Sequence, residues 1–152
     1  DNETDYIKRV IGLPGDRVQM IDSLLHINGK PVGMRTVSPP KGKLPYGTGS
    51  NDVKVFVETL PNGVEYNIYD QGWQRLDDTK EFVVPEDHFF MMGDNRDNSR
   101  DSRDSGVGYV PIENFVGRAD IIFFSIMPNG SFWQFWRWPQ TIRWSRLLQT
   151  VK

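Results

Sequence analysis

Lys8 and Arg9 are the first residues whose types and placing suggest catalysis. They lie in an extended apolar run, residues 6–11, that leads into the turn sequence Gly12-Leu13-Pro14-Gly15-Asp16. Adjacent side chains on a strand point to opposite faces, so one of the two cations is expected to face inward. A lysine moved into an apolar site loses hydration of its charged form, and a neutral amine can take a proton from a serine hydroxyl. From these residues alone, a solvated or salt-bridged pair is the simpler interpretation.

A charged loop at residues 93–104 is the second segment whose residue types could take part in chemistry, although a solvated or structural loop is the simpler interpretation of its residues alone. It follows the apolar stretch 88–92 and reads Gly-Asp-Asn-Arg-Asp-Asn-Ser-Arg-Asp-Ser-Arg-Asp. A calcium loop that started at Asp97 would need glycine at its sixth position, where this chain has Ser102. The interleaved arginines instead favour Asp–Arg pairs and Asx turns.

Turn residues indicate that β-strands position these two segments. Glycine and proline total 24 residues, and three Asn-Gly pairs each separate two apolar runs. Asn-Gly is the strongest short hairpin signal, because both residues tolerate the positive φ of a type I′ turn. The predicted hairpins cover 24–32 around Asn28-Gly29, 53–69 around Asn62-Gly63 and 121–135 around Asn129-Gly130.

Other elements are predicted with less regular patterns. Residues 33–50, with four glycines and three prolines, predict a flexible connection. The unbroken apolar run 121–124 predicts a strand buried on both faces. Helix is limited to one turn at 111–115 and a short C-terminal helix at 141–150. These patterns together predict a mainly β fold with little helix.

Composition narrows the class of protein. The chain has 152 residues, of which 38% are hydrophobic and 25% charged, as in a single globular domain. No apolar run approaches the roughly 18–20 residues of a membrane-spanning helix. The absence of cysteine excludes disulfides, thiolate metal sites and cysteine nucleophiles. His26 and His88 are isolated, so we predict structural roles for both, no metal site and no cofactor.

Charge divides the chain in two. Residues 1–120 carry a net charge of −6, whereas residues 121–152 carry +4, contain no acid and hold four of the five tryptophans. A nucleic-acid-binding protein is usually basic over a larger area. A short basic, tryptophan-rich segment fits an anionic membrane surface better, and we predict no nucleic-acid partner.

Both catalytic segments resemble motifs of the bacterial type I signal peptidases. Tyr-Ile-Lys-Arg-Val-Ile-Gly-Leu-Pro-Gly-Asp at 6–16 is similar to the motif that holds the family's catalytic lysine. Gly-Asp-Asn-Arg-Asp-Asn-Ser-Arg-Asp-Ser-Arg at 93–103 is similar to the family's last motif. The two occur in the family's order, with a variable β insertion between them. Residues 110–111 and 115–119 also fit the family.

The resemblance implies a Ser/Lys endopeptidase that cuts signal peptides from exported preproteins after small residues. It makes Lys8 the general base and Ser99 the residue that orients the Lys8 amine. It also implies a salt bridge between Asp101 and Arg103 beside the site. Further implied residues are Gly93, Asp94 and Asn95 in the supporting turn, and Asp5, Tyr6 and Ile7 on a strand where substrate adds as a further β-strand.

The implied fold is a set of coiled antiparallel β-sheets. Residues 1–33 and 81–152 would form the catalytic core, with a β-hairpin insertion subdomain at 34–80. The family's nucleophilic serine lies upstream of the lysine, just after a transmembrane anchor, and no matching motif precedes Lys8. We therefore expect this chain to be the C-terminal part of the catalytic ectodomain, inactive alone. Missing upstream strands would expose sheet edges and favour self-association.

The resemblance also gives the aromatic tail a location. It implies a bacterial inner membrane protein with its catalytic domain on the periplasmic face. The tail would then be a membrane-facing surface that contains Trp133, Trp136, Arg137 and Trp138.

Two other functions remain as alternatives to the signal peptidase. One is a self-cleaving SOS-repressor-type domain, which uses the same dyad on a related fold. The other is a non-catalytic β module that binds membrane or calcium.

Overall fold

A computed structural model describes residues 5–38, 53–122, 138–142, 144 and 147–150. The chain divides into two compact units, Asp1–Phe115 and Val116–Lys152. Within the described residues every pair of strands is antiparallel and helix is confined to short segments, which confirms the predicted mainly β class.

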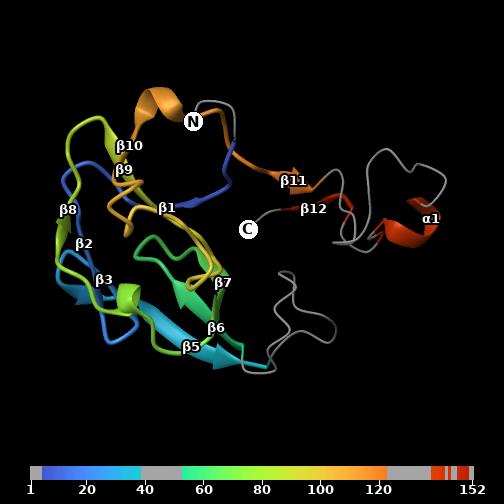
Figure 1. The fold of residues 1–152 in the computed structure, drawn as a ribbon, viewed down its shortest axis with the longest axis horizontal. Helices are drawn as coiled ribbons and strands as arrows, with labels where there is room; N and C mark the ends of the chain where they lie inside the picture. The colour runs from blue at the N-terminus through green and yellow to red at the C-terminus, as the bar shows by residue number, and fades with distance from the viewer. Residues whose placement is uncertain (1–4, 39–52, 123–137, 143, 145–146, 151–152) are drawn as a thin grey trace. The chain divides into compact units, whose positions relative to one another are not determined.

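The described residues of the first unit form three sheets (Figure 1). One has the order β1 (Arg9–Gly12), β9 (His88–Met92), β10 (Val110–Pro111). The second has the order β4 (Lys30–Pro31), β3 (Leu24–Ile27), β2 (Arg17–Ile21), β8 (Phe82–Val83). The third has the order β5 (Gly33–Val37), β6 (Lys54–Thr59), β7 (Glu65–Asp70). The described part of this unit also contains the 3₁₀ turns η1 (Arg75–Asp77) and η2 (Ile112–Asn114).

The first predicted hairpin is confirmed. β3 and β4 pair antiparallel around Asn28-Gly29. Asn28 has φ of 52° and Gly29 φ of 75°, so both central residues adopt the left-handed conformation that a type I′ turn requires. Glycine adopts this conformation without a steric penalty from a Cβ atom, which explains why this residue type occupies the turn.

The second predicted hairpin is confirmed with a longer connection. β6 and β7 pair over their whole length, from Lys54 opposite Asp70 to Thr59 opposite Glu65. Five residues, 60–64, join them, so the turn is wider than the two-residue turn of the first hairpin.

The prediction of a flexible connection at 33–50 is wrong for its first residues. Gly33–Val37 form β5, which pairs with β6 along its full length. Backbone hydrogen bonds to β6 stabilise this strand despite its weak strand pattern, because sheet pairing depends on the partner as well as on local propensity. Residues 39–50 of that prediction lie outside the described part of the chain, which resumes at residue 53.

One apolar cluster joins the three sheets of the first unit. β2 and β3 contribute Val18, Met20, Leu25 and Ile27, β1 and β9 contribute Ile11, Phe90 and Met92, and the hairpin β6–β7 contributes Tyr66 and Ile68. Phe90 and Leu25 are fully buried in it. The division into a core and an insertion at 34–80 stays a prediction, although the third sheet packs into the same cluster as the other two.

The single helical turn predicted at 111–115 is present as a 3₁₀ turn. η2 covers Ile112–Asn114, and Pro111 is its N-cap. The fixed φ of proline suits the start of a helical turn, where no backbone donor is needed.

The second unit contains a short ladder of β11 (Ile121–Ile122) with β12 (Gln149–Thr150). Ile121 is 55% exposed, so the prediction of a strand buried on both faces is wrong at this residue. The turn and second strand of the third predicted hairpin lie outside the described residues. The predicted helix at 141–150 is also wrong, since α1 covers Trp138–Thr141 and Gln149–Thr150 is a strand.

None of the helices in the described residues reaches the length and hydropathy that a membrane span needs.

Candidate active site

Lys8 and Ser99 meet at the centre of the candidate site. The Lys8 amine donates a hydrogen bond to the Ser99 hydroxyl oxygen, with an Nζ–Oγ distance of 2.7 Å. Both side chains are half-buried. Lys8 directly precedes β1, and Ser99 lies in the loop that follows β9, so the antiparallel pairing of β1 with β9 brings them together. The contact predicted between these residues is therefore present in the structure.

Gly93 is the close neighbour of this pair. A Cβ atom on Gly93 would lie 2.1 Å from Ser99 Oγ, 2.5 Å from Ser99 Cβ and 3.4 Å from Lys8 Nζ. Non-bonded heavy atoms do not approach so closely, so any side chain here would displace Ser99. Gly93 is thus required at this position by the space that Ser99 occupies.

Asp101 and Arg103 form a buried bidentate ion pair beneath the site. The Arg103 Nε and Nη2 atoms each lie 2.9 Å from one Asp101 carboxylate oxygen. The amide of Gly93 also donates to Asp101 Oδ2, at 3.0 Å. Burial disfavours the Asp101 carboxylate, but the Arg103 guanidinium and the Gly93 amide outweigh this effect and lower the pKa of Asp101 below its ordinary value.

The ion pair also fixes the shape of the loop. Arg103 Nη2 donates to the backbone oxygen of Arg96 at 2.6 Å. The Met91 amide donates to the Ser102 hydroxyl at 2.9 Å, and the Ser102 amide donates to the Met91 carbonyl at 3.0 Å. These bonds return the end of the loop to β9 and place Asp101 under Gly93.

Asp94 and Asn95 connect the loop to the remaining strands. Asp94 accepts two hydrogen bonds from Arg9, at 2.9 and 3.0 Å. The backbone oxygen of Asp94 accepts from the Tyr69 amide at 2.9 Å, and Asn95 forms a parallel bridge with Tyr69. The loop therefore runs beside the end of β7 as well as following β9 (Figure 1).

The prediction that one of Lys8 and Arg9 faces inward stays a prediction. Both are half-buried and both make polar contacts with the loop after β9. The strand begins at Arg9, so the two-residue alternation of a strand does not apply to Lys8.

The predicted pairing of the loop's charges is confirmed in part. Asp101 pairs with Arg103, and Asp104 lies 3.9 Å from Arg100 in an exposed pair. Asp94 and Arg96 instead find partners outside the loop, in Arg9 and Glu58.

The main feature that the sequence did not reveal is a buried polar cluster of Glu58, Tyr66 and Arg96. Glu58 is fully buried on β6, and Arg96 and Tyr66 are 3% and 5% exposed. A glutamate at the end of an alternating valine run is usually solvated, so the sequence carried no signal for this cluster. The burial of Glu58 is explained by its charge partner Arg96, which comes from the loop after β9.

Burial and charge act together on the cluster. Burial lowers the pKa of Arg96, but the Glu58 carboxylate outweighs it, so the pKa of Arg96 lies above its ordinary value. Burial raises the pKa of Tyr66, and the Glu58 carboxylate raises it further. Arg96 and Glu58 are thus held as an ion pair, and Tyr66 is held as a neutral phenol that donates to Glu58.

The predicted substrate-binding residues Asp5, Tyr6 and Ile7 precede β1 and lie outside a strand. All three are exposed, with Tyr6 at 71% and Ile7 at 81%. They are joined directly to Lys8 in the chain. Their role in substrate binding stays a prediction.

The structure does not test the predicted membrane-facing residues. Trp133, Trp136 and Arg137 lie outside the described residues, as does the side chain of Trp138. Their role also stays a prediction.

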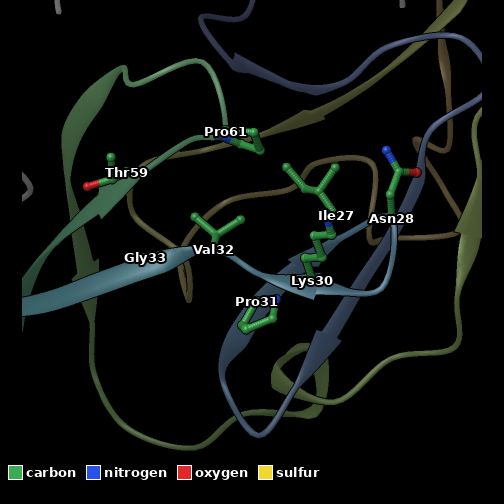
Figure 2. Close-up of a pocket in the computed structure, with 8 residues that line it drawn as sticks. All are labelled: Ile27, Asn28, Lys30, Pro31, Val32, Gly33, Thr59 and Pro61. Carbon is green, nitrogen blue, oxygen red and sulfur yellow. The ribbon is translucent and has the colours of Figure 1, made fainter.

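The structure has an apolar hollow of about 430 Å³ (Figure 2). Neither Lys8 nor Ser99 is among the residues that line it. It is lined by the first hairpin, the start of β5 and the end of β6, including Ile27, Val32, Gly33 and Thr59. Lys30 is its one ionisable lining residue, so the hollow offers no pair of groups for acid–base chemistry. The described residues hold no cluster of three or more potential metal ligands.

Known proteins match most of this chain in sequence. The family described as signal peptidase, peptidase S26, matches residues 1–124. Signal peptidase I of Rickettsia typhi is 43% identical over 132 residues, which cover 82% of this chain and 48% of that protein. Signal peptidase I of Rickettsia prowazekii is 42% identical over the same shares.

The chain spans about half the length of the curated relatives it matches. Among solved structures, a signal peptidase I from Enterococcus faecalis V583 aligns over 72% of this chain and 78% of that chain, with 27% identity and a TM-score of 0.37. The family match covers the segment with Lys8 and the loop with Ser99 and Asp101 together. The chain therefore belongs to the signal peptidase family, peptidase S26.

Proposed function

We propose that the protein carrying this chain is a membrane-associated serine endopeptidase that removes signal peptides from exported proteins after small residues. The observation that carries the proposal is the Lys8–Ser99 hydrogen bond of 2.7 Å between the two motif segments. A half-buried amine that a hydroxyl holds in one position suits the role of a general base, which supports the proposal. Membership of the signal peptidase family supports the choice of substrate.

In this mechanism the neutral Lys8 amine takes the proton of a serine hydroxyl as its oxygen attacks the scissile carbonyl. The resulting ammonium then protonates the leaving amine, and a water molecule hydrolyses the acyl-enzyme with Lys8 as base again. Ser99 keeps the amine in place throughout. In the neutral form that this mechanism requires, Lys8 donates one N–H to Ser99 and keeps its Nζ lone pair for the proton of the nucleophile.

We assign the nucleophile to a serine outside these 152 residues. The position of Ser99 supports this assignment, because Ser99 lies in the loop after β9 and its side chain packs closely against Gly93. A residue so confined suits an orienting role. If Ser99 were the nucleophile, an acylating inhibitor would label it, and mass spectrometry of the modified peptide distinguishes the two assignments.

The test is cleavage of a synthetic peptide with an Ala-X-Ala signal-peptide site by the full-length protein. Lys8→Met removes the base and is expected to lower kcat/KM by about 10²–10⁴-fold. Lys54→Met is the matched control, because Lys54 is an exposed lysine on β6. Activity of Lys8→Met within about twofold of the unmodified protein would contradict the proposal.

We further propose that the 152-residue chain is inactive alone and self-associates through exposed sheet edges. The expected results are no cleavage of the same peptide and dimers or larger species in analytical ultracentrifugation. A circular dichroism spectrum rich in β structure would show that the chain used is folded. Cleavage by the folded chain, or a clean monomer, would contradict the corresponding part.

The exposed segment before β1 supports a proposal for substrate binding. Asp5, Tyr6 and Ile7 are exposed and adjoin the base, so an extended signal peptide docking along them would present its scissile bond to Lys8. Such substrates emerge from a membrane. We therefore place the catalytic domain on the periplasmic face of a bacterial inner membrane, with the tryptophan-rich tail against the lipid surface.

A further inference from the structure

A buried ionic cluster lies next to the candidate active site and has no part in the mechanism above. Both carboxylate oxygens of Glu58 accept hydrogen bonds from Arg96, one from Nη1 at 2.7 Å and one from Nη2. Tyr66, directly opposite Glu58 on β7, donates its hydroxyl to Glu58 Oε2 at 2.7 Å. Glu58 is therefore fixed by three directional bonds inside the apolar core.

The cluster reaches the site through Arg9. The Arg9 guanidinium lies over the ring of Tyr66, with its Cζ atom 3.9 Å from the ring centroid. The same guanidinium holds both carboxylate oxygens of Asp94. Arg9 follows Lys8 in the chain, and Asp94 follows Gly93, the residue that packs against Ser99.

A second route runs through the backbone of the loop. The Arg96 amide donates to the Tyr69 carbonyl at 3.0 Å, while the Tyr69 amide donates to the Asp94 carbonyl at 2.9 Å. Asp94 and Arg96 are thus held against β7 by backbone bonds, and the Arg96 side chain is held against β6 by Glu58. The two ends of the Lys8–Ser99 contact are both tied to the β6–β7 hairpin.

An ion pair is an unusual choice for a buried junction, because its desolvation offsets much of the attraction between the charges. Apolar residues would fill the same space, but they would not fix the rotation of a guanidinium or of a phenol ring. Two parallel Arg–carboxylate bonds fix the plane of the guanidinium. Orientation is therefore what the charged cluster supplies and an apolar one would lack.

We propose that Glu58 is a positioning residue for the Lys8–Ser99 pair. It fixes Arg96 and the ring of Tyr66, and these set Arg9, Asp94 and the loop so that the Lys8 amine meets the Ser99 hydroxyl. The inference rests on the proposed function, since it assigns a role in the same site.

The test is the steady-state kinetics of Glu58→Gln in the full-length protein, with the same Ala-X-Ala peptide. Loss of the carboxylate leaves Arg96 without its charge partner and is expected to lower kcat by about tenfold or more, with KM changed by less than about twofold. Glu65→Gln is the matched control. Glu65 lies on β7, the strand next to β6, and is an exposed partner of Arg35. This variant is expected to keep its kcat. An unchanged kcat for Glu58→Gln would overturn the proposal.

A double-mutant cycle separates positioning from general stability. If Glu58 acts through the Lys8–Ser99 contact, Glu58→Gln lowers kcat by less than about threefold in a Ser99→Ala background, because the contact is already lost. If the losses multiply fully, Glu58 affects the reaction by another route and the proposal is wrong. If Glu58→Gln does not fold, Tyr66→Leu replaces it in both measurements, with Tyr66→Phe as a control that keeps the ring under Arg9.

Lys8→Met distinguishes this proposal from the proposed function. If Lys8→Met is inactive and Glu58→Gln retains kcat, only the positioning role fails. If Lys8→Met retains activity, the assignment of the base fails and the positioning role fails with it.

Discussion

At the scale of single residues, the site depends on contacts between atoms far apart in the chain. Lys8 and Ser99 are 91 positions apart and are held at hydrogen-bond distance. Gly93 makes room for Ser99, and Asp101 holds the Gly93 amide. Each of these residues acts on the next through a direct contact, so small changes in the loop are expected to reach the Lys8 amine.

Gly93→Ala is predicted to impair catalysis more than folding. Its Cβ would lie 2.1 Å from Ser99 Oγ, so Ser99 must move away from Lys8. A displacement of about 1 Å at a reacting group costs on the order of 10²-fold, and kcat of the full-length protein should fall by about this factor.

The matched control for this variant is Gly106→Ala. A Cβ on Gly106 would meet the flexible end of Arg100 and Asp104 Oδ1, and no atom of Lys8 or Ser99. We expect its kcat to stay within about twofold of the unmodified protein. Equal losses in the two variants would contradict the role given to Gly93.

Asp101→Asn is predicted to lower stability at neutral pH but not in acid. The folded-state pKa of Asp101 lies below its ordinary value, so the ionised carboxylate stabilises the fold at pH above the unfolded value of about 3.9. This stabilisation is lost as the pH falls through the folded-state pKa. Breaking one side of a buried ion pair costs about 3–5 kcal/mol.

Urea unfolding of the 152-residue chain at pH 7 and in steps below pH 4 measures the effect. The free energy of unfolding of Asp101→Asn should approach that of the unmodified chain as the pH falls. Asp104→Asn is the control, because its Arg100 partner is 74% exposed and such pairs contribute about 0–1 kcal/mol. A difference for Asp101→Asn that stayed constant with pH would contradict the assignment.

At the scale of elements, the β1–β9 ladder and the β6–β7 hairpin place the site. β9 pairs with β1 and so aligns the two motif segments. Tyr69 on β7 bonds to the loop after β9, and Glu58 on β6 binds the side chain of Arg96. The hairpin is therefore more than an addition to the core, because it contacts the loop that carries Ser99.

Gly29→Ala is predicted to destabilise the β3–β4 hairpin. Gly29 has φ of 75°, and a Cβ there would meet only Arg17 Nη2, at 4.0 Å, so the cost comes from backbone strain. An L-residue in this conformation costs about 1–2 kcal/mol, which urea unfolding of the chain should detect.

Gly33→Ala provides the comparison for this turn. Gly33 lies in β5 without positive φ, and its Cβ would make only ordinary contacts with Thr59, the shortest at 3.6 Å. Its free energy of unfolding should change by less than about 0.5 kcal/mol. If the two variants were equally stable, the turn would not carry the strain argued for Gly29.

At the scale of the whole molecule, charge and aromatic residues divide unequally along the chain. Residues 121–152 contain no acid and four of the five tryptophans. The family match ends at residue 124, so this tail lies almost entirely beyond it. The family match therefore does not bear on the proposed contact of this tail with lipid, which needs an experiment of its own.

A Trp136→Ser, Trp138→Ser double variant of the full-length protein is predicted to bind anionic lipid vesicles at least about tenfold more weakly. Two interfacial rings lose their apolar contact with the headgroup region. Trp73→Ser is the control, since Trp73 is 71% exposed in the first unit and outside the tail. Vesicle sedimentation measures the binding of the double variant, the Trp73→Ser control and the unmodified protein. Equal binding by these three proteins would count against the proposed contact of the tail with lipid.

The sequence by itself determined the fold class, two hairpins and the residues of the central contact. Asn28-Gly29 and Asn62-Gly63 predicted hairpins because turn conformation is a local property of the chain. The two motif segments named Lys8, Ser99, Asp101 and Arg103 through their resemblance to a family.

Only the tertiary structure decided which partners Glu58, Arg96 and Arg9 take. Glu58 is buried because Arg96 approaches it from a loop 38 positions away, and Arg9 is held by Asp94 at a separation of 85. β5 forms in a glycine- and proline-rich stretch because β6 offers it hydrogen bonds, and β11 pairs with the distant strand β12. These outcomes depend on distant partners, whose desolvation and hydrogen bonding no local pattern records.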